Sequence, residues 1–126
     1  HALWDPAHHW QNIKTKEHDR IKLKVNMVTL DSVVDFIPKL IKIDVEGCEL
    51  MVLKGAEKIL KEYKPYVVSE VNWMALKEMG TNQEELQNYM RSLGYKAFSL
   101  PEEKEIDLTK LNYDRLNLNV LFKYCG

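Results

Sequence analysis

The stretch LIKIDVEGCE, residues 40–49, decides the fold of this chain. Apolar residues alternate with charged ones over Leu40–Val45, which predicts a strand with one buried face and one polar face. Gly47 ends this strand, and apolar residues at helical spacing then predict a helix over Glu49–Lys64. A short apolar run follows at Tyr66–Val71. A strand, a helix and a second strand in this order predict a βαβ unit, with parallel strands and a right-handed crossover.

Toward the amino end, the same periodicities predict shorter elements. Thr29–Ile37 is expected to form a short helix, which Thr29 or Asp31 can cap. Before it, Ile21–Val28 alternates apolar residues with lysine and asparagine, which is the period of a half-exposed strand. Residues 1–20 show neither a helical nor a strand period, so we expect an irregular arm there.

Toward the carboxyl end, the pattern predicts one more helix and two more strands. Asn82 and Glu85 have the spacing of a capping box at the start of the helix, and Gly94 is a natural stop at its end. Tyr95–Leu100 and Leu118–Tyr124 are the expected strands. The polar connection between them shows no clear helix, so we expect these strands to be antiparallel. The chain is therefore predicted to be a single α/β domain.

Composition narrows the classes of function. The 126 residues carry 18 Lys and Arg against 19 Asp and Glu, a net charge of -1, so no basic excess favours nucleic acid or an anionic membrane as a partner. No apolar run approaches the roughly 20 residues of a membrane span. Cys48 and Cys125 are far apart in the sequence, so we expect free thiols, a reducing compartment and a cytoplasmic protein.

Carboxylates gather around the turn that ends the first strand of the βαβ unit. Asp44 lies at the carboxyl end of that strand, and Glu70 lies at the same end of the next one. Open parallel sheets bind ligands beyond the carboxyl ends of their strands, so this pair predicts a polar floor for a cationic or hydroxyl-rich ligand. The alternative is a structural role, in which Asp44 pairs with Lys42 on the strand face. Glu46 and Glu49 can likewise be charges favoured at the start of a helix.

Two further groups have both a functional and a structural interpretation. Asn72 and Trp73 follow the second strand, where they could line a ligand pocket or lead into a helix. The other group lies in the arm and comprises Asp5, His8, His9 and His18. Adjacent histidines rarely bind one ion, and no second shell of partners accompanies them, so we expect no metal site there.

Several motifs of the chain form an ordered series. They are Thr29-Leu30-Asp31, the stretch 40–49, Leu53-Lys54-Gly55-Ala56, Lys64-Pro65, Glu70, Gly94-Tyr95 and residues 119–122. This series closely resembles the FkbM-type S-adenosylmethionine-dependent methyltransferases, over about residues 28–124. Cys48 stands where that family usually has alanine, a change that suits a tightly packed turn.

The resemblance implies a partial Rossmann-like methyltransferase sheet, with strands four to seven, crossover helices and an antiparallel last strand. It implies that Asp44 lies beside the methyl-transfer site, where it would hold the cofactor's amino group, orient the acceptor or help to deprotonate it. Glu46 would be a second catalytic residue at the rim of the site. Glu70, Asn72 and Trp73 would line the acceptor pocket. The implied cofactor is S-adenosylmethionine, and the implied acceptor is a sugar, a polyketide or a similar small molecule with hydroxyl groups.

One departure from the family pattern affects the expected activity. Enzymes of this kind hold the cofactor with a glycine-rich loop after the first strand, and the five glycines of this chain are too dispersed to form one. We therefore expect residues 28–126 to be the carboxyl-terminal half of the domain, and residues 1–27 to be an irregular arm with a possible substitute strand. The isolated chain is then expected to be inactive, to bind the cofactor weakly and to associate with itself through an exposed sheet edge. The alternative is a non-catalytic α/β interaction module that has lost the cofactor-binding half.

Overall fold

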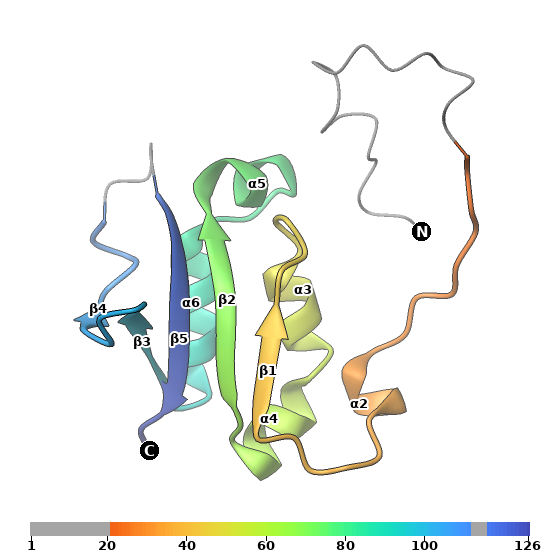
Figure 1. Ribbon diagram of the computed structural model, residues 1–126, viewed down its shortest axis with the longest axis horizontal. Helices are drawn as coiled ribbons and strands as arrows, with labels where there is room; N and C mark the ends of the chain where they lie inside the picture. Colours follow the sequence, from red (N-terminus) through yellow and green to blue (C-terminus); the bar gives the residue numbers. More distant parts are fainter. Residues whose placement is uncertain (1–20, 112–115) are drawn as a thin grey trace.

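The computed structural model describes residues 21–111 and 116–126, and Figure 1 shows its helices and strands. The helices are α2 (Leu30–Val33), α3 (Glu49–Lys54), α4 (Glu57–Tyr63), α5 (Trp73–Glu78) and α6 (Gln83–Ser92). The strands are β1 (Leu40–Ile43), β2 (Tyr66–Asn72), β3 (Tyr95–Ser99), β4 (Glu105–Ile106) and β5 (Asn117–Tyr124). The strands predicted downstream of α2 are thus all present, with ends that differ from the prediction by one or two residues.

The strands form one sheet in the order β1-β2-β5-β3-β4. β1 and β2 are parallel, and α3 and α4 connect them, which confirms the predicted βαβ unit. β5 lies between β2 and β3 and is antiparallel to both, which confirms the expected orientation of the last strand. β4 is a short antiparallel strand inside the connection for which the pattern predicted no element. In Figure 1, α3, α4 and α6 all lie behind the same face of the sheet.

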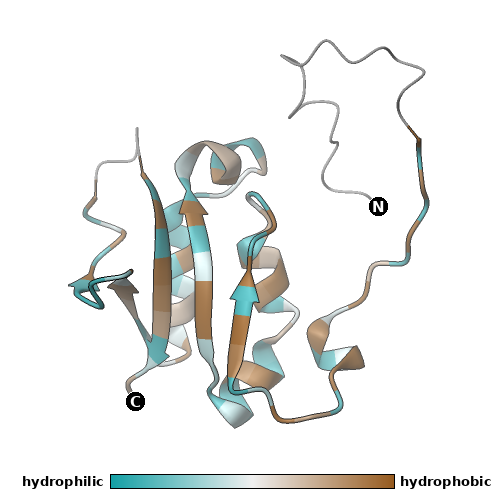
Figure 2. Cartoon of the chain, viewed as in Figure 1, coloured by the Kyte–Doolittle hydropathy of each residue, from teal (hydrophilic) through white to brown (hydrophobic). Residues whose placement is uncertain are grey.

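The hydrophobic core lies between this helical face and the sheet. Val67 and Val71 of β2 are fully buried, and Val67 is paired in register with the buried Phe122 of β5. Leu53 and Leu60 from α3 and α4 are fully buried as well. Figure 2 shows the apolar residues of β1, β2 and β5 side by side in the middle of the sheet. Each such side chain stabilises the fold by about 1.5–3 kcal/mol, and together they hold the carboxyl ends of β1 and β2 next to each other.

The single helix predicted over Glu49–Lys64 is in fact two helices, α3 and α4. Asp31 stabilises the break between them. Its backbone N–H donates to the carbonyl of Gly55 at 2.9 Å, and its carboxylate accepts from the backbone N–H groups of Lys58 and Ile59, both at 3.0 Å. Those N–H groups belong to the first turn of α4 and have no partner within the helix. Asp31 therefore caps a helix that begins far downstream of it in the sequence.

The local helix caps follow the predictions more closely. The side chain of Thr29 caps α2 by accepting a backbone N–H at 3.2 Å, although the helix ends at Val33 rather than at Ile37. The side chain of Asn82 caps α6 by accepting the N–H of Glu85 at 2.8 Å, as predicted. These caps were predictable because donor and acceptor are only three residues apart.

The strand predicted over Ile21–Val28 is not formed. This segment has no regular secondary structure, and its apolar side chains are exposed, with both Ile21 and Val25 at 84%. Alternation makes a strand possible, but a strand needs a neighbour to pair with, and none of the described strands pairs with this segment. The arm, residues 1–20, lies outside the described residues, as do the histidines that it carries.

Candidate functional site

The candidate site is built at the turn between β1 and α3, where the chain leaves the sheet. Glu46 and Gly47 both have positive φ angles there, of 48° and 104°. A Cβ atom on Gly47 would lie 2.2 Å from the backbone oxygen of Ala75 in α5, far inside contact distance. Glycine is required at this position because the turn packs directly against the backbone of α5. This contact brings the helix that follows β2 beside the acidic turn that follows β1.

Glu49, the first residue of α3, is a buried carboxylate that holds the turn together. The residue is 2% exposed, and its Oε2 atom accepts the backbone N–H of Gly47 at 3.0 Å. Burial raises the pKa of Glu49 above its ordinary value, while backbone hydrogen bonds, including the one from Gly47, act in the opposite direction. The Glu49 carboxylate thus binds the backbone of the turn, whereas the Glu46 side chain is exposed.

Asp44 and Glu70 are neighbours across β1 and β2. The register pairs Ile43 with Ser69, which face the helices, so the next residue on each strand faces the opposite, open side. The two carboxyl groups therefore lie next to each other on that face. The pKa of Glu70 is raised by burial first, and then by the neighbouring Asp44 carboxyl group and by the negative charges of the surrounding carboxylates.

The structural alternative proposed for Asp44 is not realised. Within residues 21–111 and 116–126, no ion pair joins Lys42 to Asp44, and none joins a lysine or arginine to Glu70. Lys42 is exposed on the same face of β1. The carboxyl pair therefore keeps its capacity to bind a cationic or hydroxyl-bearing group.

A small hollow of about 90 Å³ lies between the turn and the start of α5. It is lined by Glu46, Glu49, Glu70, Asn72 and Ala75. Of the residues predicted for the site, Glu46, Glu70 and Asn72 thus line one hollow, and Asp44 adjoins it through Glu70.

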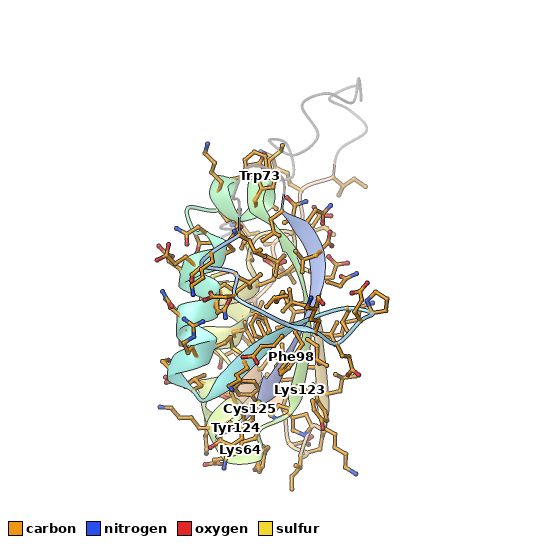
Figure 3. All side chains as sticks on the ribbon, turned by 90° about the vertical axis from the view of Figure 1, so that its left-hand side faces the viewer. Lys64, Trp73, Phe98, Lys123, Tyr124 and Cys125 are labelled. Atoms are coloured by element: carbon orange, nitrogen blue, oxygen red, sulfur yellow. The ribbon has the colours of Figure 1, made fainter. Side chains whose placement is uncertain are left out.

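Asn72 and Trp73, at the end of β2 and the start of α5, were expected either to line a ligand pocket or to lead into a helix. Asn72 lines the hollow, but its Oδ1 atom also caps α5 by accepting the N–H groups of Met74 (3.0 Å) and Ala75 (3.2 Å). Trp73 begins α5 and does not line the hollow, and its backbone N–H donates to the carbonyl of Leu116 at 2.9 Å. Figure 3 shows Trp73 at the end of the molecule where β2 finishes.

β5 adds two polar residues that the sequence analysis did not assign to the site. Asn119 is paired in register with Glu70, and Asn117 with Asn72. Asp44, Glu70 and Asn119 therefore form a row across three adjacent strands on the open face of the sheet. The sequence signal for these two residues is that asparagines alternate with apolar residues at the start of the strand. Only the pairing of β5 with β2 shows that they lie at the site.

This rim of carboxylates and amides suits particular kinds of chemistry. Carboxylates hold cationic groups through charge-assisted hydrogen bonds, and they accept protons from hydroxyl groups. Among the residues that the structure describes, no group of His, Cys, Asp and Glu could hold a metal ion. No helix in that part of the chain is long and apolar enough to cross a bilayer. Cys48 and Cys125 are both free thiols.

A mixed sheet in this strand order, with carboxylates at the carboxyl ends of two neighbouring parallel strands, defines a methyltransferase-like α/β fold. The chain belongs to the methyltransferase FkbM domain family, whose sequence pattern matches residues 4–97. It is also similar to the methyltransferase FkbM from Methylobacillus flagellatus KT, known from a crystal structure, with 26% sequence identity and a TM-score of 0.50. That similarity covers 74% of this chain but only 22% of the other. No curated protein matches the chain.

These comparisons confirm the resemblance and the methyltransferase-type sheet predicted from the ordered motifs. The family match begins at residue 4, so it also includes most of the arm, which lies upstream of the residues on which the resemblance rested.

Proposed function

We propose that this chain forms the acceptor side of an S-adenosylmethionine-dependent methyltransferase, which methylates a hydroxyl group of a sugar, a polyketide or a similar small molecule. The observation that carries the proposal is the adjacent pair of carboxyl groups, Asp44 and Glu70, toward the carboxyl ends of neighbouring parallel strands, in a chain of the FkbM domain family. Open α/β sheets bind their ligands at this edge.

Each residue of the rim has a role in this proposal. Asp44 accepts a hydrogen bond from the acceptor hydroxyl and can take up its proton. The raised pKa of Glu70 means that it holds a proton more readily than an ordinary glutamate, and in its protonated form it can donate a hydrogen bond to a ligand oxygen. Glu46 supplies a further catalytic carboxylate at the mouth of the hollow, and Asn72 lines its wall. Trp73 lies outside the hollow and would contact only the outer part of a larger acceptor.

The residues of the rim also fit the cofactor. S-adenosylmethionine carries a cationic sulfonium and an amino group, and an acidic rim in which no lysine or arginine of residues 21–111 and 116–126 pairs with Asp44 or Glu70 suits such groups. The alternative role of Asp44 is to hold this amino group, in place of binding the acceptor hydroxyl. When bound, the cofactor would supply an electrophilic methyl group.

The proposal places the remaining cofactor contacts in a longer polypeptide. The five glycines of the chain are too far apart in the sequence to form a glycine-rich cofactor loop. The similar methyltransferase is also much longer than the part that this chain matches. We expect the coding sequence upstream of residue 1 to encode that loop.

Replacement of Asp44 tests the proposed chemistry in the parent protein. Asp44→Asn keeps the shape of the side chain and removes its charge, so turnover should fall by about 10²-fold or more. Asp35→Asn, at an exposed carboxylate away from the rim, is the matched control and should retain full turnover. The rate of methyl transfer and the melting temperature are measured on the same preparation. Wild-type turnover in Asp44→Asn, together with a lowered melting temperature, would show a purely structural role.

A further inference from the structure

A second and larger hollow lies at the opposite end of the sheet from the acidic rim. Its volume is about 340 Å³, and it opens between the segment before β1, the loop between α4 and β2, and the end of β5. Its walls include Tyr63, Tyr66 and Tyr124, with Lys39 and Lys64 beside them. No carboxylate of the described residues lines it. The hollow therefore combines exposed aromatic faces with positive charge.

The floor of this hollow is rigid. Pro38 and Pro65 line it and are both buried. The N–H of Tyr66 donates to the carbonyl of Lys39 at 2.9 Å, and the hydroxyl of Tyr95 donates to the carbonyl of Pro65 at 2.8 Å. These hydrogen bonds fix the two backbone segments on either side of the hollow relative to the sheet.

The ring of Tyr124 is held in place although it is 39% exposed. A Cβ atom on Gly94 would lie 2.6 Å from this ring, so the ring covers the glycine closely. The ring of Tyr95 meets that of Tyr124 edge to face, with centroids 5.9 Å apart. Tyr124 thus presents a preorganised aromatic surface, which lowers the entropic loss on binding a ligand.

Lys64 occupies a backbone conformation that does not favour a lysine. It ends α4 with φ 51° and ψ 47°, in the left-handed region where glycine is the preferred residue. Its Nζ atom lies 4.5 Å from the centroid of the Tyr124 ring, and Figure 3 shows the two residues together at the end of the molecule opposite Trp73. The disfavoured backbone therefore places an ammonium group over the face of the Tyr124 ring, beside the hollow.

We propose that this hollow binds a small aromatic carboxylate. The volume is within the usual range for ligand pockets. A flat ring can stack on the exposed rings of Tyr63 and Tyr66, while Lys64, Lys39 and the tyrosine hydroxyls supply donors to the carboxylate. A neutral ring would offer no opposite charge to the ammonium groups, and an aliphatic acid would lose the stacking. The site lies away from the acidic rim, so it does not depend on the proposed methyl transfer.

Titration of the 126-residue chain with benzoate, followed by two-dimensional NMR, tests the proposal. We expect saturable shifts at Lys64, Tyr66 and Tyr124. Benzamide, which lacks the charge, and cyclohexanecarboxylate, which lacks the aromatic face, should each bind about tenfold more weakly, the loss expected for one charge-assisted or stacking contact.

Two variants separate a specific site from general attraction to lysine. Lys64→Gly removes the ammonium group at a position where glycine is favoured, so the fold should be kept and benzoate binding should weaken by about tenfold. Lys61→Gln, on α4 but outside the hollow, is the control and should bind like the wild type. The proposal is overturned if benzoate gives no saturable shifts at millimolar concentration. It is equally overturned if benzamide binds as well as benzoate, or if Lys64→Gly binds unchanged.

Discussion

Replacement of Gly47 by alanine should disrupt the turn that carries the acidic rim. At φ 104° an alanine is strained, and its methyl group would lie 2.2 Å from the oxygen and 2.7 Å from the carbon of the Ala75 carbonyl. Because both atoms belong to the backbone of α5, no side-chain rotation can relieve the overlap. Either the turn or the helix must move.

Gly80 provides a matched control for the backbone strain. It also has a positive φ, of 77°, but a Cβ atom there would have nothing within 4 Å. Forcing alanine into a left-handed conformation costs about 1–2 kcal/mol at either position. At Gly47 the steric overlap adds about 1–3 kcal/mol, so Gly47→Ala should lower the free energy of unfolding by about 2–5 kcal/mol in total.

Urea denaturation followed by circular dichroism measures the loss in the free energy of unfolding for both variants. Thermal denaturation followed by the same signal measures the loss in melting temperature. For a domain of this size, about 4 °C of melting temperature corresponds to 1 kcal/mol, so Gly47→Ala should lose about 8–20 °C and Gly80→Ala about 4–8 °C. If Gly47→Ala is no less stable than Gly80→Ala, the turn does not pack on the backbone of α5, and the geometry of the site described above is wrong.

Two further predictions concern Asp31 and Glu70. Asp31→Ala removes both hydrogen bonds to the start of α4 and should lower the free energy of unfolding, measured by urea denaturation, by about 1–3 kcal/mol. Asp35→Ala, at an exposed site, should change this free energy little. Equal losses in the two variants would contradict the assigned cap. The fold raises the pKa of Glu70, so its contribution to stability is present while it is protonated at low pH and is lost as the pH rises through the folded-state pKa. Glu70→Gln should therefore melt at a higher temperature than the wild type at neutral pH, and the difference should disappear in acid. If the difference in melting temperature between the two proteins is constant from about pH 4 to pH 7, the pKa of Glu70 is not raised.

Much of the fold could be predicted because its signals are local. The alternation in residues 40–45 predicted β1, and Gly47 predicted the turn that follows it. The cap at Asn82 joins groups three residues apart. The break between α3 and α4 could not be predicted in this way, since the Asp31 carboxylate and the Lys58 N–H that it accepts are 27 residues apart. Residues 21–28 show the converse, because a strand-like alternation produces no strand without a neighbour to pair with.

In the candidate site, too, some features could be predicted from the local sequence and others depend on the tertiary structure. The sequence by itself determined that Asp44 and Glu70 lie toward the carboxyl ends of neighbouring parallel strands, because strand order and the βαβ rule follow from patterns within short segments. Only the tertiary structure decided that burial and the neighbouring carboxylates raise the pKa of Glu70, that Asn119 lies in the same row, and that the Ala75 carbonyl leaves no room beyond glycine at the turn. The reason is physical: steric overlap, hydrogen bonds and shifts in pKa depend on distances through space, and the sheet brings together groups that the sequence keeps apart.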